Sequence, residues 1–131
     1  MIVADAGVVL EALLFSGRHG QLARQRLAST DVHVPELLDL EVLSALRRLT
    51  AQGVASPSQG PHVLRGLRLA NIVRHPHVWF LNRVWELRDS VTPYDAVYVA
   101  MAERANATLV TLDNRLASAH GPRCRIEVLA V

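Results

Sequence analysis

The sequence predicts an α/β fold, with a central parallel sheet of about five short strands and helices on both faces. Short β-rich apolar runs alternate with amphipathic segments along the chain, and the connections between them are short. Of the 131 residues, 50% are hydrophobic and 20% are charged, which is typical of an ordinary globular domain. A single domain spanning residues 1–131 is therefore expected.

Five runs rich in apolar and β-branched residues, each bounded by turn residues, predict the strands. In chain order they cover residues 1–4, 32–34, 71–73, 108–111 and 125–129. Because helices separate them, the strands should run parallel, so that their carboxyl ends meet at one edge of the sheet. Binding and catalytic sites of such sheets form just beyond that edge.

Six amphipathic segments predict the helices. They cover residues 8–15, 22–28, 37–49, 63–69, 78–87 and 94–105. Thr92, followed by Pro93 and Asp95, forms a capping box with proline at the first helical position. Ser56-Pro57 offers a similar helix start inside residues 52–61, which we expect to form a loop between two helices.

Composition excludes several classes of chemistry. All 14 basic residues are arginine, so no catalytic lysine, P-loop or Schiff base is available. The single cysteine, Cys124, allows neither an intrachain disulfide nor a Cys-only zinc site, in keeping with a reducing, cytoplasmic setting. The opening residues 1–5 do not predict a signal peptide, and no apolar run approaches the ~20 residues of a membrane span.

The middle of the chain is rich in arginine, although the net charge is only +2. Between Val42 and Trp85 there is no acidic residue, and the basic residues are Arg47, Arg48, Arg65, Arg68, Arg74 and Arg83. Guanidinium groups pair bidentately with phosphate oxygens, so this stretch suits a nucleic-acid backbone. Solvated helix faces are the alternative interpretation.

Four acidic residues are placed where they could converge on one crevice. Asp5 and Asp113 follow predicted strands, Asp95 lies in the first turn of a helix, and Glu41 lies in the helix that Pro35-Glu36 opens. Each also has a structural interpretation. Asp5 and Asp113 could be helix N-caps, Asp95 could belong to the capping box, and Glu41 could pair with Arg48.

A shared site for these carboxylates would require a cation. Two carboxylates about 5 Å apart repel by ~3 kcal/mol at an effective dielectric constant near 20. A divalent cation removes that repulsion, and oxygen ligands favour Mg²⁺ or Mn²⁺ over zinc.

The motifs that carry these residues resemble the PIN-domain ribonucleases, particularly VapC-type toxins of toxin–antitoxin pairs. The resemblance covers essentially the whole chain. It rests on the order of the four acidic residues in the segments Met1-Ile-Val-Ala-Asp5, Pro35-Glu-Leu-Leu-Asp-Leu-Glu41, Thr92-Pro-Tyr-Asp95-Ala-Val-Tyr98 and Thr111-Leu-Asp113.

The resemblance implies cleavage of structured cellular RNA (transfer, ribosomal or messenger) by a water that Mg²⁺ or Mn²⁺ activates, leaving 5′-phosphate and 3′-hydroxyl ends. It implies that Asp5 and Asp95 are the principal metal ligands, with Asp113 beside them, and that Glu41 orients the attacking water or relays its proton. Arg47 and Arg48, on the same helix as Glu41, would guide the RNA backbone. The resemblance also implies a homodimer and a VapB-like antitoxin that blocks the site.

Two positions depart from the family pattern. Family members commonly carry Ser or Thr two residues after the first Asp, where this chain has Gly7, and often Asn three residues after the Glu, where it has Ser44. Altered tuning of the site is expected, and a PIN-like module that binds RNA or a protein without cutting is the alternative function. Trp79, Phe80 and Trp85 are expected to fill a core or a dimer interface rather than to stack on RNA bases.

Overall fold

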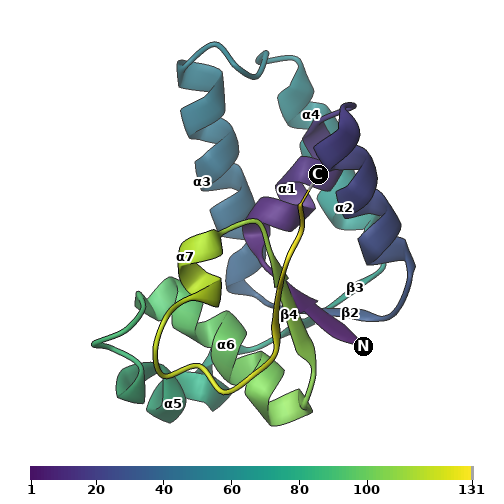
Figure 1. Cartoon of the computed structure of the whole chain (residues 1–131). Helices are drawn as coiled ribbons and strands as arrows, with labels where there is room; N and C mark the ends of the chain where they lie inside the picture. The colour runs from purple at the N-terminus through teal and green to yellow at the C-terminus, as the bar shows by residue number, and fades with distance from the viewer. Residues whose placement is uncertain (131) are drawn as a thin grey trace.

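A computed structural model describes residues 1–130 of the chain. Its sheet has five strands in the order β3-β2-β1-β4-β5, and all neighbours pair in parallel (Figure 1). All five predicted strands are confirmed. Their bounds are β1 Ile2–Ala4, β2 Val32–Pro35, β3 Ile72–His75, β4 Thr108–Thr111 and β5 Ile126–Val128.

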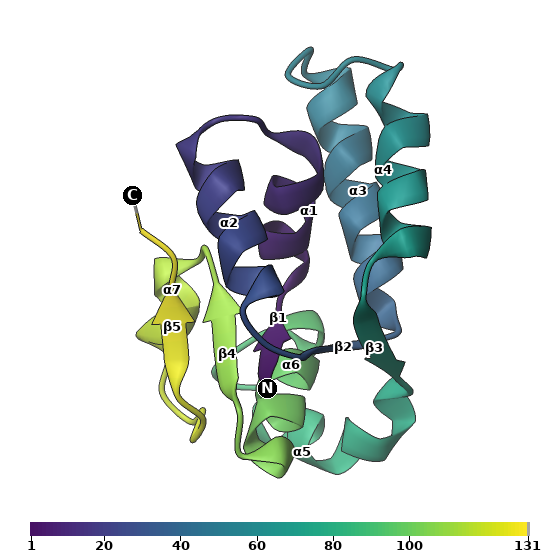
Figure 2. The same ribbon diagram turned by 90° about the vertical axis from the view of Figure 1, so that its right-hand side faces the viewer.

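Helices cover both faces of the sheet, as predicted. Along the chain they are α1 Ala6–Leu14, α2 Arg18–Ala28, α3 Leu37–Ala51, α4 Gln59–Leu69, the 3₁₀ helix η1 His77–Phe80, α5 Leu81–Glu86, α6 Pro93–Ala105 and α7 Asn114–Ala117. Helix α1 packs against α2, α3 and α4, whereas α6 packs against β1, β2 and β4 (Figures 1 and 2). None of the helices in residues 1–130 has the length and apolar character needed to cross a membrane.

Three elements differ from the sequence prediction. The helix expected over residues 78–87 is divided into η1 and α5, because buried Phe80 takes a non-helical conformation with φ −110° and ψ 6°. The loop expected at 52–61 is shorter, since α4 begins at Gln59 and Ser56-Pro57 forms a turn before it. Helix α7 was not predicted, because its four residues are too few to show a helical period.

The sheet and α6 form the core that supports the site. Every residue of β1 is buried, and so is the continuous run 96–102 of α6. Helix α6 is covered on its outer side by α5 and η1, and Arg83 of α5 binds Glu103 of α6 at 2.7 and 3.0 Å. The first turn of α6, which carries Asp95, is therefore held beneath the central strands.

Candidate active site

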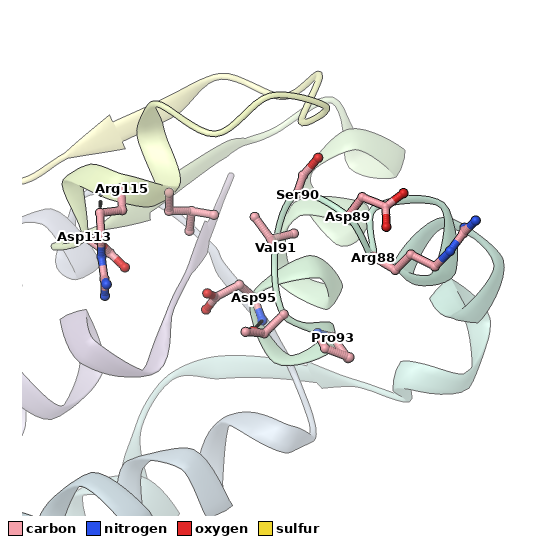
Figure 3. Close-up of a pocket in the computed structure, with 10 residues that line it drawn as sticks. Arg88, Asp89, Ser90, Val91, Pro93, Asp95, Asp113 and Arg115 are labelled. Atoms are coloured by element: carbon pink, nitrogen blue, oxygen red, sulfur yellow. Dashed lines mark hydrogen bonds and ion pairs between the residues drawn. The ribbon is translucent and has the colours of Figure 1, made fainter.

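The predicted acidic residues lie at the carboxyl edge of the two central strands. Asp5 directly follows β1, and its backbone N–H donates to the Val110 carbonyl of β4 at 3.1 Å. Asp113 follows β4, Asp95 lies in the first turn of α6, and Glu41 lies in α3. In Figure 3 the Asp95 carboxylate points toward the side of the gap that carries Asp113.

Asp5 is held at both carboxylate oxygens. Its Oδ1 accepts from the Val8 N–H at 3.0 Å, so Asp5 caps α1, and its Oδ2 accepts from the Thr111 hydroxyl. Thr111 Oγ1 in turn accepts from the Asp113 N–H at 3.0 Å. Burial raises the pKa of Asp5, and the charges of Asp95 and Asp113 raise it further against these hydrogen bonds. The N-cap interpretation of Asp5 is therefore correct, and it also places the carboxylate at the sheet edge.

Glu41 has a partner that the sequence analysis did not assign to it. The hydroxyl of Tyr98, a buried residue of α6, donates to Glu41 Oε1 at 2.6 Å. Burial raises the pKa of Glu41, and so do the charges of Asp95 and Asp5, whereas the Tyr98 hydroxyl lowers it. The alternative pairing of Glu41 with Arg48 is wrong, because no ion pair joins these two side chains within residues 1–130 and Glu41 binds Tyr98 instead. The signal for Tyr98 was its place three residues after Asp95 on one helix.

The Asp95 carboxylate forms no ion pair within residues 1–130. Its backbone N–H donates to Thr92 Oγ1 at 3.2 Å, which confirms half of the predicted capping box. The Asp95 carboxylate also interacts with the Thr92 hydroxyl. Burial raises the pKa of Asp95, and the charge of Asp113 raises it further. Asp113 caps α7 by accepting from the Arg115 N–H at 2.9 Å.

The donor set fits a hydrated divalent cation. Asp95 and Asp113 line one cavity, and Thr111 links the Asp5 carboxylate to the Asp113 backbone. Glu41 joins this group through Tyr98, which lies three residues after Asp95 on α6. As the side chains stand, no three acidic, histidine or cysteine residues within 1–130 form a group that could hold a metal ion by themselves. Mg²⁺ usually keeps several waters and binds through only one or two carboxylates. Two carboxylates of this acidic edge would be enough for such an ion.

The arginine-rich stretch is divided between structural and solvent-exposed roles. Arg74 binds Asp39 at 2.8 and 2.9 Å, and Arg83 binds Glu103, so these two guanidinium groups stabilise the fold. Arg47 and Arg48 are exposed, as are Arg65 and Arg68. The expectation that the stretch as a whole serves RNA is therefore wrong for Arg74 and Arg83.

Two other arginines, which sequence reasoning missed, lie beside the acidic edge. Arg88 and Arg115 line a cavity of about 470 Å³ together with Asp95 and Asp113 (Figure 3). The only signal in the sequence was the position of Arg115 two residues after Asp113. Arg88 could not be found this way, since the chain must fold before it approaches the cavity.

The aromatic residues separate into two groups. Phe80 is buried, as expected for a core residue, whereas Trp79 is 58% exposed and Trp85 is 68% exposed. The Arg88 guanidinium lies 4.7 Å from the ring centroid of Trp85. A core role is therefore wrong for the two tryptophans.

The chain is similar to known proteins over almost its whole length. A model of the PIN-domain family matches residues 2–121. Ribonuclease VapC9 of Mycobacterium tuberculosis is 41% identical over 129 residues, which cover 98% of both chains. The structure of Mycobacterium tuberculosis VapC20, a sarcin–ricin loop cleaving toxin, matches with a TM-score of 0.68 at 12% identity, covering 90% of this chain and 94% of that one. A chain of a toxin–antitoxin complex from Klebsiella pneumoniae matches with a TM-score of 0.66 at 17% identity, covering 98% and 97%.

The parallel sheet and its acidic carboxyl edge define a PIN-domain protein. The family model and the relative of 41% identity show that this chain belongs to the PIN-domain family, among its VapC-type members. The predicted family and fold class are confirmed. Proteins of this family are generally dependent on a divalent metal ion.

The contact between Tyr98 and Glu41 makes a testable prediction. Replacing Tyr98 with Phe keeps the buried ring but removes the hydroxyl that lowers the pKa of Glu41. The pKa of Glu41 then rises, and a base that must be ionised loses activity as the pH falls. We expect the acidic limb of the RNA-cleavage rate to move to higher pH, with a loss of rate of about tenfold on the acidic side of the profile.

Tyr94→Phe is the matched control for this pH profile, because Tyr94 is 59% exposed and its hydroxyl donates to no described residue. An unchanged acidic limb in Tyr98→Phe would show that Tyr98 does not tune Glu41.

Gly7 gives a second prediction, because it leaves open space beside Asp5. A Cβ added at Gly7 would lie 3.5 Å from Asp5 Oδ1, an ordinary contact, so serine fits. The hydroxyl of a serine at this position would supply one more polar group at the metal-binding edge. We expect Gly7→Ser to lower the Mg²⁺ concentration needed for half-maximal thermal stabilisation about fivefold, the value of one hydrogen bond.

Gly7→Ala is the control, since it adds the same Cβ without the hydroxyl. Equal Mg²⁺ dependence in the two variants would contradict a role for the hydroxyl.

Proposed function

We propose that this chain is the toxin of a toxin–antitoxin pair. In this proposal it is an endoribonuclease that hydrolyses structured cellular RNA with Mg²⁺ or Mn²⁺ and leaves 5′-phosphate and 3′-hydroxyl ends. Its membership of the PIN-domain family, among relatives named VapC ribonucleases, supports the enzyme class. The observation that carries the proposal is that Asp5, Asp95 and Asp113 lie at one sheet edge, with Glu41 joined to them through the Tyr98 hydroxyl.

The site residues have separate roles in the proposed reaction. Asp5 and Asp95 would hold the divalent ion, with Asp113 beside them. Such an ion, when bound, neutralises charge on the phosphoryl oxygens and lowers the pKa of water. The Thr111 hydroxyl fixes the orientation of Asp5, and Thr111 also positions the Asp113 backbone.

Glu41 is the proposed proton acceptor. The Tyr98 hydroxyl occupies its Oε1, which leaves Oε2 to take the proton from the attacking water. Burial and the neighbouring acidic charges raise the pKa of Glu41, so its carboxylate is a stronger base than an exposed one. Arg47 and Arg48, exposed farther along α3, would attract the RNA backbone.

The activity test uses the purified chain, freed of any partner, and total bacterial RNA. Discrete fragments with 5′-phosphate ends are expected with Mg²⁺ or Mn²⁺ and not with EDTA. RNA binding without cleavage under both metal conditions would contradict the nuclease and favour the non-cutting PIN-like module. The departures at Gly7 and Ser44 would then be examined first.

The proposed assembly is a homodimer that an antitoxin inactivates. Exposed apolar side chains on α3, η1, α5 and α6 support a protein interface. They are Leu40, Val78, Leu81, Trp85 and Tyr94. Leu81 and Tyr94 also line an apolar cavity of about 160 Å³ with Leu37, Val84 and Val97. The toxin–antitoxin complex of similar fold supports the antitoxin partner.

A charge at Leu81 should disrupt such a dimer. Leu81 is 54% exposed, so Leu81→Glu leaves the monomer core intact but places a carboxylate in the proposed interface. Light scattering should show a dimer for the parent chain and a dimerisation constant at least tenfold weaker for the variant. Leu69→Glu, on α4 and 70% exposed, is the control. A monomeric parent chain would contradict the homodimer.

A further inference from the structure

The cavity that Asp95 and Asp113 line also contains a basic side chain and apolar surface, to which the proposed catalysis assigns no role. Its volume is about 470 Å³, within the range of about 300–1,000 Å³ typical of small-molecule sites. Asp95 and Asp113 lie on two sides of it, and Arg115 lies beside Asp113 (Figure 3). Val91, Pro93 and Leu116 add apolar surface. The cavity therefore offers a positive charge and an apolar wall next to the proposed site of phosphodiester cleavage.

Most of the other arginines that form hydrogen bonds donate them to carbonyl or carboxylate groups of the protein itself. Arg24 donates to the carbonyls at the end of α1, and Arg26, Arg74 and Arg83 bind Glu127, Asp39 and Glu103. Arg88 lines the cavity, but its guanidinium covers Trp85 and donates to the Trp85 carbonyl at 3.0 Å. In Figure 3 the Arg88 side chain extends away from Asp95.

Arg115 is different because its guanidinium is available. Its side chain is 94% exposed, and its one ion pair within residues 1–130 joins Nε to Asp113 Oδ1 at 3.4 Å. That contact is long and solvated, so breaking it costs little. The two terminal guanidinium nitrogens donate to no described residue, and together they present the fork that pairs with phosphate oxygens.

The charge of Arg115 also acts on the acidic edge. It lowers the pKa of Asp95, against the effects of burial and Asp113. An anionic RNA phosphate approaching Asp95 and Asp113 is repelled by both carboxylates, and Arg115 is placed to offset that repulsion.

We propose that this cavity binds one nucleotide of the RNA, with Arg115 holding its phosphate and Val91, Pro93 and Leu116 contacting its base or ribose. The proposal rests on the proposed ribonuclease function and assigns part of its substrate site. Arg115 is then a substrate-binding residue, in addition to Arg47 and Arg48. An unstacked nucleotide in the cavity also implies that the RNA is single-stranded or locally opened at the cleavage point.

A direct test measures binding without catalysis. The full chain in EDTA is titrated with the four 5′-mononucleotides, while the methyl resonances of Val91 and Leu116 are followed by NMR. At least one nucleotide should shift these methyl groups, leaving the Val73 methyl groups on β3 unchanged. The matching nucleoside, which lacks the phosphate, should bind at least about fivefold more weakly.

Arg115→Gln and Arg125→Gln each remove one positive charge, so a comparison of these two variants isolates the role of Arg115. Arg115→Gln should weaken nucleotide binding about fivefold or more, and Arg115→Lys should restore part of it. Arg125 is exposed, and its side chain forms no hydrogen bond or ion pair with a described residue. Arg125→Gln should therefore bind the nucleotide as the parent chain does. In RNA cleavage Arg115→Gln should raise KM more than it lowers kcat.

The proposal is overturned if no nucleotide shifts the Val91 and Leu116 methyl groups, or if Arg115→Gln and Arg125→Gln bind equally well. Nucleotide binding by a chain that cleaves no RNA would support the cavity and reject the ribonuclease. Cleavage of RNA without nucleotide binding at these methyl groups would support the ribonuclease and reject the nucleotide site in the cavity.

Discussion

Replacing Asp95 with Asn should reduce RNA cleavage by at least about a thousandfold, equivalent to about 4 kcal/mol of transition-state stabilisation. Asp95 forms no ion pair within residues 1–130, so its charge is available for a cation. Asparagine keeps the shape but cannot supply that charge. Binding of RNA in EDTA should stay the same or become stronger, because one negative charge near the phosphate is removed.

The same variant should remain folded. Burial and Asp113 raise the pKa of Asp95 in the folded chain, so the ionised group destabilises the fold above its ordinary pKa of 3.8. The neutral amide removes that cost at neutral pH, and thermal unfolding in EDTA should occur at the same or a higher temperature. Asp31→Asn, at an exposed acidic residue before β2, is the control. Full cleavage by Asp95→Asn would reject Asp95 as a metal ligand.

Replacing Gly20 with Ala should destabilise the fold, because Gly20 is the glycine at which an added Cβ meets the closest backbone atom. A Cβ at this buried position of α2 would lie 1.9 Å from the Phe15 carbonyl oxygen and 2.8 Å from its carbon. Both atoms belong to the backbone at the end of α1, so the α1–α2 corner must move. The Phe15 carbonyl also accepts from Arg24 Nη1 at 2.7 Å, a contact that the movement would disturb. We expect a loss of about 2–3 kcal/mol, or roughly 10 °C in Tm.

Gly60→Ala is the control, and its free energy of unfolding, measured by calorimetry or denaturant unfolding, should change in the opposite direction. No atom lies within 4 Å of a Cβ added at Gly60, and the residue is in the first turn of α4. Alanine should stabilise that helix by up to about 1 kcal/mol. A Gly20→Ala chain as stable as its parent would show that the corner between the two helices adapts without cost.

Local patterns were sufficient for most of the fold. The alternation of apolar runs and amphipathic segments located all five strands, and the cap at Thr92 located the start of α6. Both signals depend on residues within one or two turns of each other. The same reasoning failed at Phe80, where burial against the core interrupts the helix, and at α7, which is shorter than the period that would reveal it.

The candidate site was predicted only in part. A carboxylate after a parallel strand lies at the sheet edge whatever the rest of the chain does, so Asp5 and Asp113 could be placed from the sequence. The arginines could not be assigned in the same way. Arg74 and Arg83 look like Arg115 in the sequence, and their different roles depend on which acidic residue the fold brings near.

The sequence by itself determined the α/β class, the strand positions, the family and the four acidic residues. The tertiary structure decided which side chains support them. Tyr98 reaches Glu41 across 57 residues of chain, and Thr111 reaches Asp5 across 106. These contacts exist because the strand order places β4 beside β1 and α6 beneath both. The cavity that Arg115 borders has the same origin, since its walls come from the loop before α6 and from α7, which are adjacent only in the folded chain.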